Sequence, residues 1–313
     1  MALYTQYDAV GIKEDISDII SNISPTKTPF QAAIGNEKST QKLFQWQEDS
    51  LRAVSDNNQA EGFEASDVAI TATTMRNNVT QILSETTKVS GSIDVASAYG
   101  RAKESAYQLS KTMAQVKRDL EHAFVGTAQA KVSPSDNLSN RKMAGFQRQL
   151  LNDGGNAMSS ANTVLYTGGT STQPTEDNLL DLLEGLYDNG ADPSVIMVTP
   201  TNSRVIADFA KASGRYRTYE GGATKLVNVV DIYVSPFGQQ RVVINRFLLD
   251  KNTLVFEPDM WKQVTFRPWT REVLAKTGDS VKNMVVGEFS LKHKNYLASG
   301  AIVERSASAN AYA

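Results

Sequence analysis

The sequence predicts an α+β fold, and three observations lead to that prediction. A segment with uninterrupted helical periodicity covers residues 94–126, strand patterns dominate the last third of the chain, and an apolar segment with two prolines lies within residues 1–40. The chain has 313 residues, of which 41% are hydrophobic and 21% are charged, so it can bury a sizeable core. A chain of this length typically folds into about two domains.

The composition excludes several classes of protein. The formal net charge of -2 and the sequence pI of about 5.8 argue against a strongly basic nucleic-acid binder, although local contact with DNA stays open. The absence of cysteine excludes disulfides, thiolate metal sites and cysteine nucleophiles. We find neither a signal sequence nor an apolar run of the roughly 18 residues that cross a membrane, and we therefore expect a soluble protein made in a cytoplasm.

The first 40 residues are predicted to form an arm. Pro25 and Pro29 fix their own φ angles and restrict the residues before them, so we expect extended backbone until about Thr40 and no helix through the prolines. Upstream, residues 13–23 have the pattern of a short amphipathic helix, with four isoleucines on one face: Ile16, Ile19, Ile20 and Ile23. Because so apolar an arm needs a surface to bury it, we expect it to hold on to another copy of the chain, and to be needed for assembly more than for folding.

Residues 41–91 are predicted to form a long projecting hairpin. In its first strand Phe44 and Trp46 face one way, and a threonine- and valine-rich strand follows over residues 71–91. The polar stretch between them, residues 48–67, carries six acidic residues and one arginine. Since a two-stranded hairpin is marginally stable alone, it also calls for a neighbouring surface.

Residues 94–126 give the strongest helix signal, with apolar residues in steps of three and four. Asp94 is a plausible N-cap and Gly126 a natural end. One straight helix over this range would be roughly 45 Å long, which few compact domains need.

Helices and strands share the remaining residues. In residues 288–294 the side chains of Phe289, Leu291 and His293 are expected on one face of a strand, with polar residues on the other. The other predicted helices cover residues 141–151, 174–186 and 201–212, and the other predicted strands cover residues 194–200, 227–236, 241–245 and 253–257.

A search for catalytic, metal or cofactor sites finds little. His122 and His293 are the only histidines and are most simply structural, and no glycine-flanked serine nucleophile is present. Two glycine-bearing loops lack the phosphate-loop spacing, and the acidic stretch lacks the calcium-loop spacing. Arg215, Tyr216 and Arg217 could stack on a single-stranded nucleic acid, but we favour a protein contact. The sequence therefore predicts no enzyme, no metal and no cofactor.

Three short motifs in this order resemble a known family. The segments NISPTKTPF, WQEDSL and RKMAGF, together with the order of the elements, resemble a subfamily of tailed-bacteriophage major capsid proteins with the Hong Kong 97-type fold. This resemblance implies a subunit with four parts: an N-terminal arm (1–40), an extended loop (41–91), a peripheral domain with a spine helix (92–173 and 261–313), and an axial domain (174–260).

The resemblance also implies a function. The chain would assemble into hexamers and pentamers of an icosahedral shell around phage double-stranded DNA. Its further partners would be a portal protein, a separate scaffolding protein and decoration proteins, with no membrane. It would be a virion protein, made and assembled in the cytoplasm of a bacterial host. Two alternatives stay open: a cellular nanocompartment shell of the same fold, and an α+β enzyme with an unrecognised site.

We expect the contacts between copies to involve charge as well as apolar burial. The stretch from Glu48 to Asp67 has a formal charge of about -5, whereas residues 101–121 of the long helix have about +2. We therefore expect the acidic tip of one copy to meet the basic helix of the next. The residues predicted to lie at assembly interfaces are Ile16, Ile19, Ile20, Phe30, Trp46, Glu61, Glu64, Lys117, Arg118, Arg215, Tyr216 and Arg217.

Overall fold

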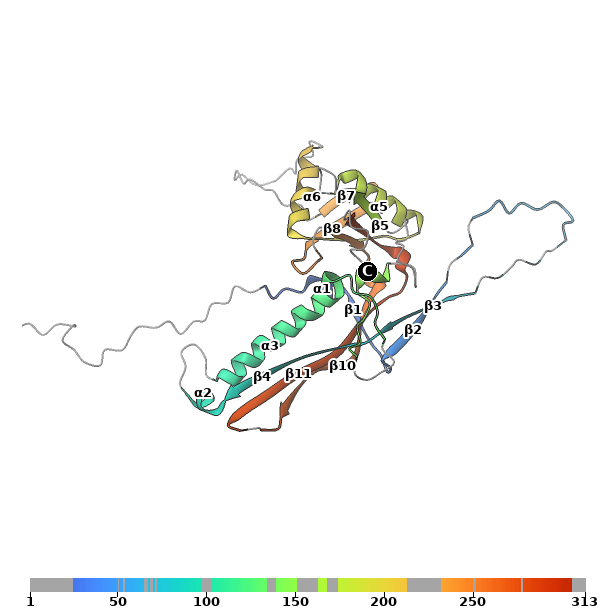
Figure 1. Ribbon diagram of the computed structural model, residues 1–313. Helices are drawn as coiled ribbons and strands as arrows, with labels where there is room; N and C mark the ends of the chain where they lie inside the picture. Colours follow the sequence, from blue (N-terminus) through green and yellow to red (C-terminus); the bar gives the residue numbers. More distant parts are fainter. Residues whose placement is uncertain are drawn as a thin grey trace, which may run out of the picture.

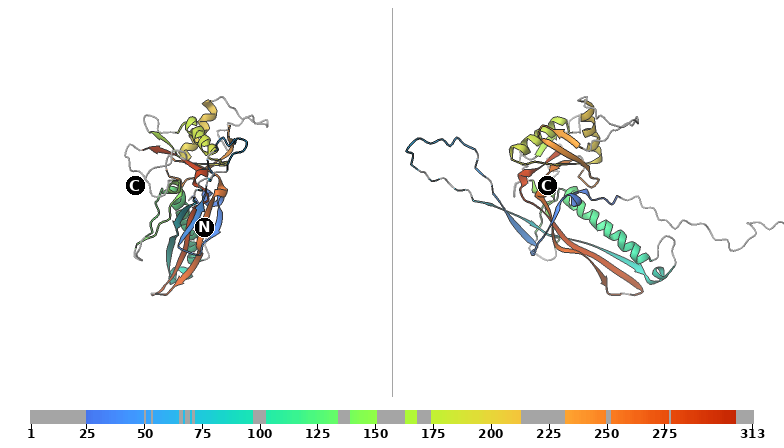
Figure 2. Two further views of the ribbon diagram at one scale, coloured as in Figure 1. Left: turned by 90° about the vertical axis from the view of Figure 1, so that its right-hand side faces the viewer. Right: turned by 180° about the vertical axis from the view of Figure 1, so that it is seen from behind.

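The subunit consists of two β-sheets with a long helix beside one of them and a projecting hairpin (Figure 1). Figure 2 shows from two further sides that the larger sheet and its helices lie at one end of helix α3 (Glu104–Glu121). The computed structural model describes residues 25–49, 51–52, 54–64, 67, 70, 72–96, 103–133, 139–150, 163–167, 174–212, 232–249, 252–276 and 278–305.

The first sheet has four strands in the order β1-β10-β11-β4, and α3 packs against β4 and β11. Strand β1 is parallel to β10, whereas the other two pairs are antiparallel. The bounds are β1 Gly35–Lys38, β4 Gln81–Ser90, β10 Trp261–Leu274 and β11 Ser280–His293.

The second sheet has six strands in the order β5-β12-β9-β6-β8-β7, and α5 packs on β12 and β5 while α6 contacts β6. Helix α5 begins with a capping box between Thr175 and Asn178, which satisfies two N–H groups of its first turn. The bounds are β5 Thr163–Thr167, β6 Val195–Val198, β7 Ile232–Ser235, β8 Gly238–Ile244, β9 Thr253–Phe256, β12 Ser299–Arg305, α5 Glu176–Asp188 and α6 Pro200–Ala212.

The predicted hairpin is present, and its second strand continues into the main sheet. Strand β2 (Leu43–Glu48) pairs antiparallel with β3 (Thr74–Val79), which confirms the strand expected around Phe44 and Trp46. After β3 the chain changes sheet at Thr80 and continues as β4. The hairpin is therefore directly connected to the four-stranded sheet.

The single long helix predicted for residues 94–126 is wrong in extent. The structure has a short helix α2 (Gly91–Val95), then α3, and finally a π-helical turn, His122–Gly126. Asp94 is not an N-cap, because it lies inside α2 and Lys103 is the residue that precedes α3. Its Oδ1 nevertheless accepts a hydrogen bond at 3.0 Å from the N–H of Ser105, in the first turn of α3. This bond is the main reason that the pKa of Asp94 lies below its ordinary value.

Gly126 ends the helical segment, as predicted, for a reason that periodicity does not reveal. A Cβ at this position would overlap the Phe247 carbonyl oxygen and the His122 ring, so the loop after β8 can approach the helix end only where a side chain is missing. The Leu249 N–H donates to the Val125 carbonyl at 3.2 Å across the same contact.

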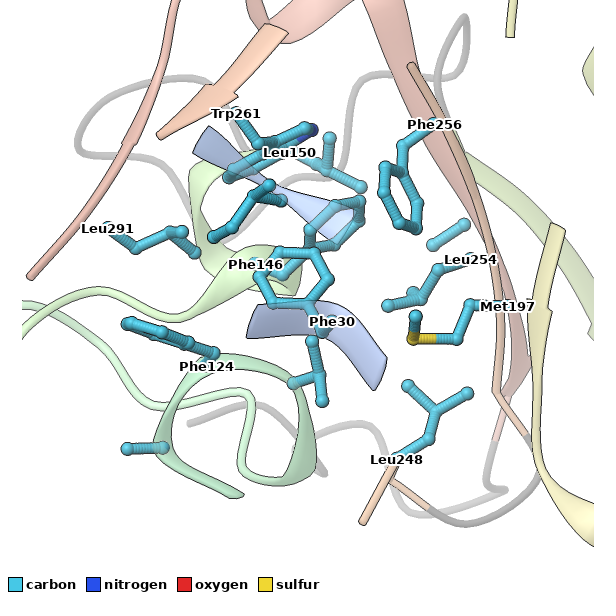
Figure 3. Close-up of a cluster of buried hydrophobic side chains, with 14 of the residues drawn as sticks. Phe30, Phe124, Phe146, Leu150, Met197, Leu248, Leu254, Phe256, Trp261 and Leu291 are labelled. Carbon is cyan, nitrogen blue, oxygen red and sulfur yellow. The ribbon is translucent and has the colours of Figure 1, made fainter. Parts of the chain in front are cut away.

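One hydrophobic core joins the two sheets (Figure 3). Met197, Leu254 and Phe256 come from the six-stranded sheet, and Trp261 and Leu291 come from the four-stranded sheet. A second core lies under α5, around its leucines at positions 179, 182, 183 and 186. The remaining described elements are helix α1 (Pro29–Ala33), helix α4 (Phe146–Gln149) and two 3₁₀ turns, Pro258–Met260 and Tyr296–Ala298.

Two strands from the predicted peripheral ranges share a sheet with strands from the predicted axial range, 174–260. Strands β5 and β12 fall within the ranges 92–173 and 261–313 that were assigned to a peripheral domain, yet both belong to the six-stranded sheet. The reason is long-range pairing: β12 is parallel to β5 and antiparallel to β9, and no local pattern encodes that choice.

Candidate assembly interface

Phe30 lies in the core of its own subunit. Its side chain is 0% exposed, and its ring makes edge-to-face contacts with Phe124, Phe146, Phe256 and Trp261 at centroid distances of 5.4–6.3 Å. Figure 3 shows it in the middle of the labelled side chains. The expectation that Phe30 contacts a neighbouring copy is therefore corrected, because no part of its side chain is left for one.

The arm is also not extended throughout residues 25–40. Helix α1 (Pro29–Ala33) begins at the second proline, which fits the first helical position because that position has no helical partner for an N–H. Strand β1 follows and pairs with β10 of the same subunit. The second half of the arm thus belongs to its own subunit, and the isoleucines before Pro25 lie outside the described residues.

Trp46 lies at the root of the hairpin, where it helps to hold a buried carboxylate. Its ring is 5.2 Å from that of His293 in a perpendicular arrangement, and its Nε1 donates to Glu48 Oε1 at 3.3 Å. Glu48 Oε1 also lies 3.0 Å from His293 Nδ1, and Glu48 Oε2 accepts from Arg76 Nε at 3.0 Å. Trp46 is 9% exposed, so its indole mainly supports its own subunit.

The electrostatics of this root favour an ionised carboxylate. Burial raises the pKa of Glu48, whereas the contacts with His293 and Arg76 lower it. The lowering is the larger effect, so the pKa lies below its ordinary value of 4.5. Arg76 also stacks over the Tyr296 ring, with its guanidinium carbon 4.6 Å from the centroid. Both strands of the hairpin are therefore fixed to the end of β11 by side chains.

A second buried carboxylate, Glu288, fixes the point where β3 becomes β4. Its side chain is 2% exposed and pairs with Arg141 at 2.6 Å and Arg267 at 3.0 Å. Thr80 donates to the same carboxylate at 2.5 Å. The sequence pattern placed Glu288 on a polar strand face, and nothing in that pattern indicated that this face is buried as well.

Beyond its root, the hairpin exposes apolar side chains that contact little of their own subunit. Leu51, Val54 and Ile70 are 98%, 101% and 97% exposed. Glu61 and Glu64 are also exposed, as the acidic-tip hypothesis requires. A projecting segment that combines bare apolar and acidic side chains is typical of an interaction surface.

The basic side of α3 differs from the one expected. Lys117 is exposed, but Arg118 is half-buried, with its guanidinium 5.6 Å from the Phe247 ring of the same subunit. Glu121, counted among the surface charges, is 0% exposed. Six other candidate residues lie outside the described residues: Ile16, Ile19, Ile20, Arg215, Tyr216 and Arg217.

The described part of the chain contains no cluster of three or more histidine, aspartate or glutamate side chains that could hold a metal ion. Among the same residues, no helix is both long and apolar enough to cross a membrane. The feature of the described residues that best suits contact between proteins is the hairpin, whose root is fixed to the main sheet and whose far part is exposed.

Comparison with known proteins gives a consistent result. The sequence profile of the family described as SU10 major capsid protein matches residues 3–306. The major capsid protein of Escherichia phage Phieco32 is 30% identical over an alignment of 339 positions, which covers 96% of this chain and 96% of that protein.

Solved structures share the fold at low sequence identity. The capsid of a native GTA particle has a TM-score of 0.65 at 13% identity and covers 96% of this chain and 98% of its own. A protein of Gordonia phage Cozz has a TM-score of 0.61 at 10% identity, with coverages of 94% and 92%. The holo-SrpI encapsulin complex from Synechococcus elongatus PCC 7942 has a TM-score of 0.60 at 10% identity, with coverages of 96% and 95%.

Proposed function

This chain belongs to the SU10 major capsid protein family, and from that premise we propose how its copies join into a shell. It is the major capsid protein of a phage head and has the Hong Kong 97-type fold, as the sequence resemblance implied. Our proposal is that the copies form hexamers and pentamers in which the hairpin of one subunit lies on the next.

The observation that carries this proposal is the exposure of the hairpin beyond its root. Leu51, Val54 and Ile70 are almost completely bare in the single subunit, while the root is fixed by Glu48 and Glu288. A rigid root with an uncovered apolar extension supports docking on a second copy, because burial there would remove apolar surface from water. A contact between unlike surfaces of identical subunits closes into a ring when the rotation allows.

Charge supports the same arrangement. We propose that Glu61 and Glu64 of one copy face Lys117 of the next, while Arg118 contributes less because it already packs on Phe247. Each exposed pair contributes only about 0–1 kcal/mol, so its value lies in register and in rejecting wrong partners.

The remaining parts of the proposal rest on the family resemblance. We propose that the four-stranded sheet with α3 forms the peripheral part of the subunit and that the six-stranded sheet with α5 and α6 forms the axial part. We further propose that the partners include portal, scaffolding and decoration proteins and packaged DNA, that assembly takes place in the host cytoplasm, and that the protein catalyses no reaction. Arg215, Tyr216 and Arg217 are proposed to lie near the capsomer axis.

Electron microscopy of the purified full-length chain, with scaffolding protein supplied, tests the proposal. Closed shells or rings of five and six subunits are the expected particles. A strictly monomeric protein at high concentration would contradict it. The nanocompartment alternative shares the fold with the encapsulin neighbour; an enclosed enzyme in place of nuclease-protected DNA would favour it over a phage head.

A further inference from the structure

Glu121, the last residue of α3, connects three parts of the subunit: α3 itself, the arm, and the loop after β8 of the six-stranded sheet. Its Oε1 accepts hydrogen bonds from the Phe30 N–H at 2.8 Å and from Asn245 Nδ2 at 2.7 Å. Its Oε2 accepts from the Gln31 N–H at 3.0 Å and from Gln31 Nε2 at 3.2 Å. Phe30 and Gln31 belong to the arm, and Asn245 follows β8 of the six-stranded sheet.

The chemistry of these four contacts favours a charged carboxylate over a neutral one. Every partner is an N–H donor, so both oxygens must act as acceptors, and a hydrogen on either oxygen would face a donor. Bonds of this kind are stronger than bonds between neutral groups, and they replace the water that a buried charge has lost. Glu121 is therefore a costly residue to bury unless the arm and Asn245 are both in place.

Asn245 and α1 have no hydrogen bond to one another in the described structure; the carboxylate connects them. Asn245 is tied to the six-stranded sheet because its N–H donates to the Val198 carbonyl at 2.9 Å. Phe30 is tied to both sheets through the core that they share. The carboxylate thus completes a chain of contacts from arm to helix to six-stranded sheet.

We propose that Glu121 is a coupling residue that makes the seating of the arm root, residues 29–34, and the position of the six-stranded sheet depend on each other. When either donor set leaves, the buried charge loses part of its compensation, so keeping the carboxylate in place against the remaining donors costs more free energy. A pull on the arm would then loosen the loop after β8, and movement of that sheet would loosen the arm. This coupling is a property of the single subunit and does not depend on how copies assemble.

Amide hydrogen exchange on the full-length subunit tests the coupling between residues that are connected through the Glu121 carboxylate. Asn245→Ala should speed exchange of the Phe30 and Gln31 amides by about tenfold, although in the described structure no hydrogen bond joins Asn245 to either residue. In the reverse direction, Gln31→Ala should speed exchange in residues 245–249. Asn202→Ala is the matched control, because Asn202 is a buried asparagine that donates to Thr253 and not to Glu121.

The outcomes separate coupling from simple local loosening. If Asn245→Ala and Gln31→Ala each change exchange only in their own segment, or if Asn202→Ala loosens the arm equally, the proposal is overturned. Glu121→Gln supplies a second measurement: the amide keeps one acceptor oxygen but places its NH2 group against the two donors at the other oxygen position, so under the coupling both segments should exchange faster together. Faster exchange in only one of them would also contradict the coupling.

Discussion

His293 Nδ1 lies 3.0 Å from Glu48 Oε1, although β11 and β2, which carry these residues, belong to different sheets. Because Arg76 of β3 binds the other oxygen of the same carboxylate, one side chain holds both strands of the hairpin against the main sheet. The buried Glu48 carboxylate therefore helps to hold the root of the hairpin against the main sheet.

Acid should weaken the subunit through Glu48. Its folded-state pKa is below the ordinary 4.5, so its contacts contribute stability above that value and lose it as the pH falls through the lowered pKa. We expect the free energy of unfolding to fall with acid less steeply in Glu48→Gln, which should be about 1.5–3 kcal/mol less stable at neutral pH. Urea denaturation at several pH values measures this. Equal slopes for Glu48→Gln and the original protein would refute the role of Glu48.

Glu121 should show the opposite pH dependence. Burial is the largest influence and raises its pKa, despite the hydrogen bonds that lower it. The folded state then binds a proton more tightly, so the stability from this group is present below 4.5 and is lost as the pH rises through the raised pKa. Glu121→Gln should remove that loss in denaturation experiments over the same window. If the free energy of unfolding of Glu121→Gln depends on pH in the same way as that of the original protein, the pKa of Glu121 does not differ between the folded and unfolded states.

Truncation should separate the arm into two parts. Removing residues 1–24 should leave a cooperatively folding subunit with impaired assembly, whereas removing residues 1–35 should unfold it, since Phe30 and the donors to Glu121 are lost. Phe30→Ala alone should cost about 3–5 kcal/mol. Thermal unfolding of both truncated proteins checks this prediction. If the protein without residues 1–35 is stable and unfolds cooperatively, the whole arm serves assembly, as expected from the sequence.

Gly126→Ala should destabilise the contact between the π-helical turn and the loop after β8. The new methyl group would overlap the backbone oxygen of Phe247, which cannot move as a side-chain tip can, so we expect a loss of about 1–3 kcal/mol. Gly35→Ala is the control, because its Cβ would meet only the flexible end of Lys262. Denaturation midpoints should fall for the first variant alone; similar midpoints for both would contradict the close-approach argument.

Charge reversal tests the surfaces between copies. Glu61→Lys with Glu64→Lys should impair assembly, and adding Lys117→Glu should partly restore it. Salt at about 1 M shortens the Debye length to about 3 Å and should weaken assembly of the original protein. Light scattering of assembling subunits provides the measurement. If the triple variant assembles no better than the double variant, Lys117 does not face these glutamates.

The sequence predicted the elements well where periodicity and turn chemistry decide them. The hairpin strands, the strand at Val195–Val198, helices α5 and α6 and the end at Gly126 follow from local patterns. Phe30 shows the limit: a phenylalanine beside two prolines predicts apolar burial but does not specify which subunit buries it. The structure shows that α1 fills its own core.

The buried charges could not be predicted for a related reason. Glu48, Glu121 and Glu288 each obtain their partners from segments far away in the sequence. A charged residue on an alternating strand or at a helix end is usually exposed, and only tertiary pairing reverses that expectation.

The pairing of β1 with β10 and of β12 with β5 has a consequence for synthesis on the ribosome. Gly35 finds its partner at Lys262, and β12, which separates β5 from β9, is made after every other strand of its sheet. Contacts between residues so distant in sequence form slowly, because the intervening chain must first be closed into a loop. A nascent chain interrupted before residue 299 would leave β5 and β9 without the strand between them. Unfinished polypeptides would therefore be unable to complete the sheet and would be kept out of the growing particle by their own topology.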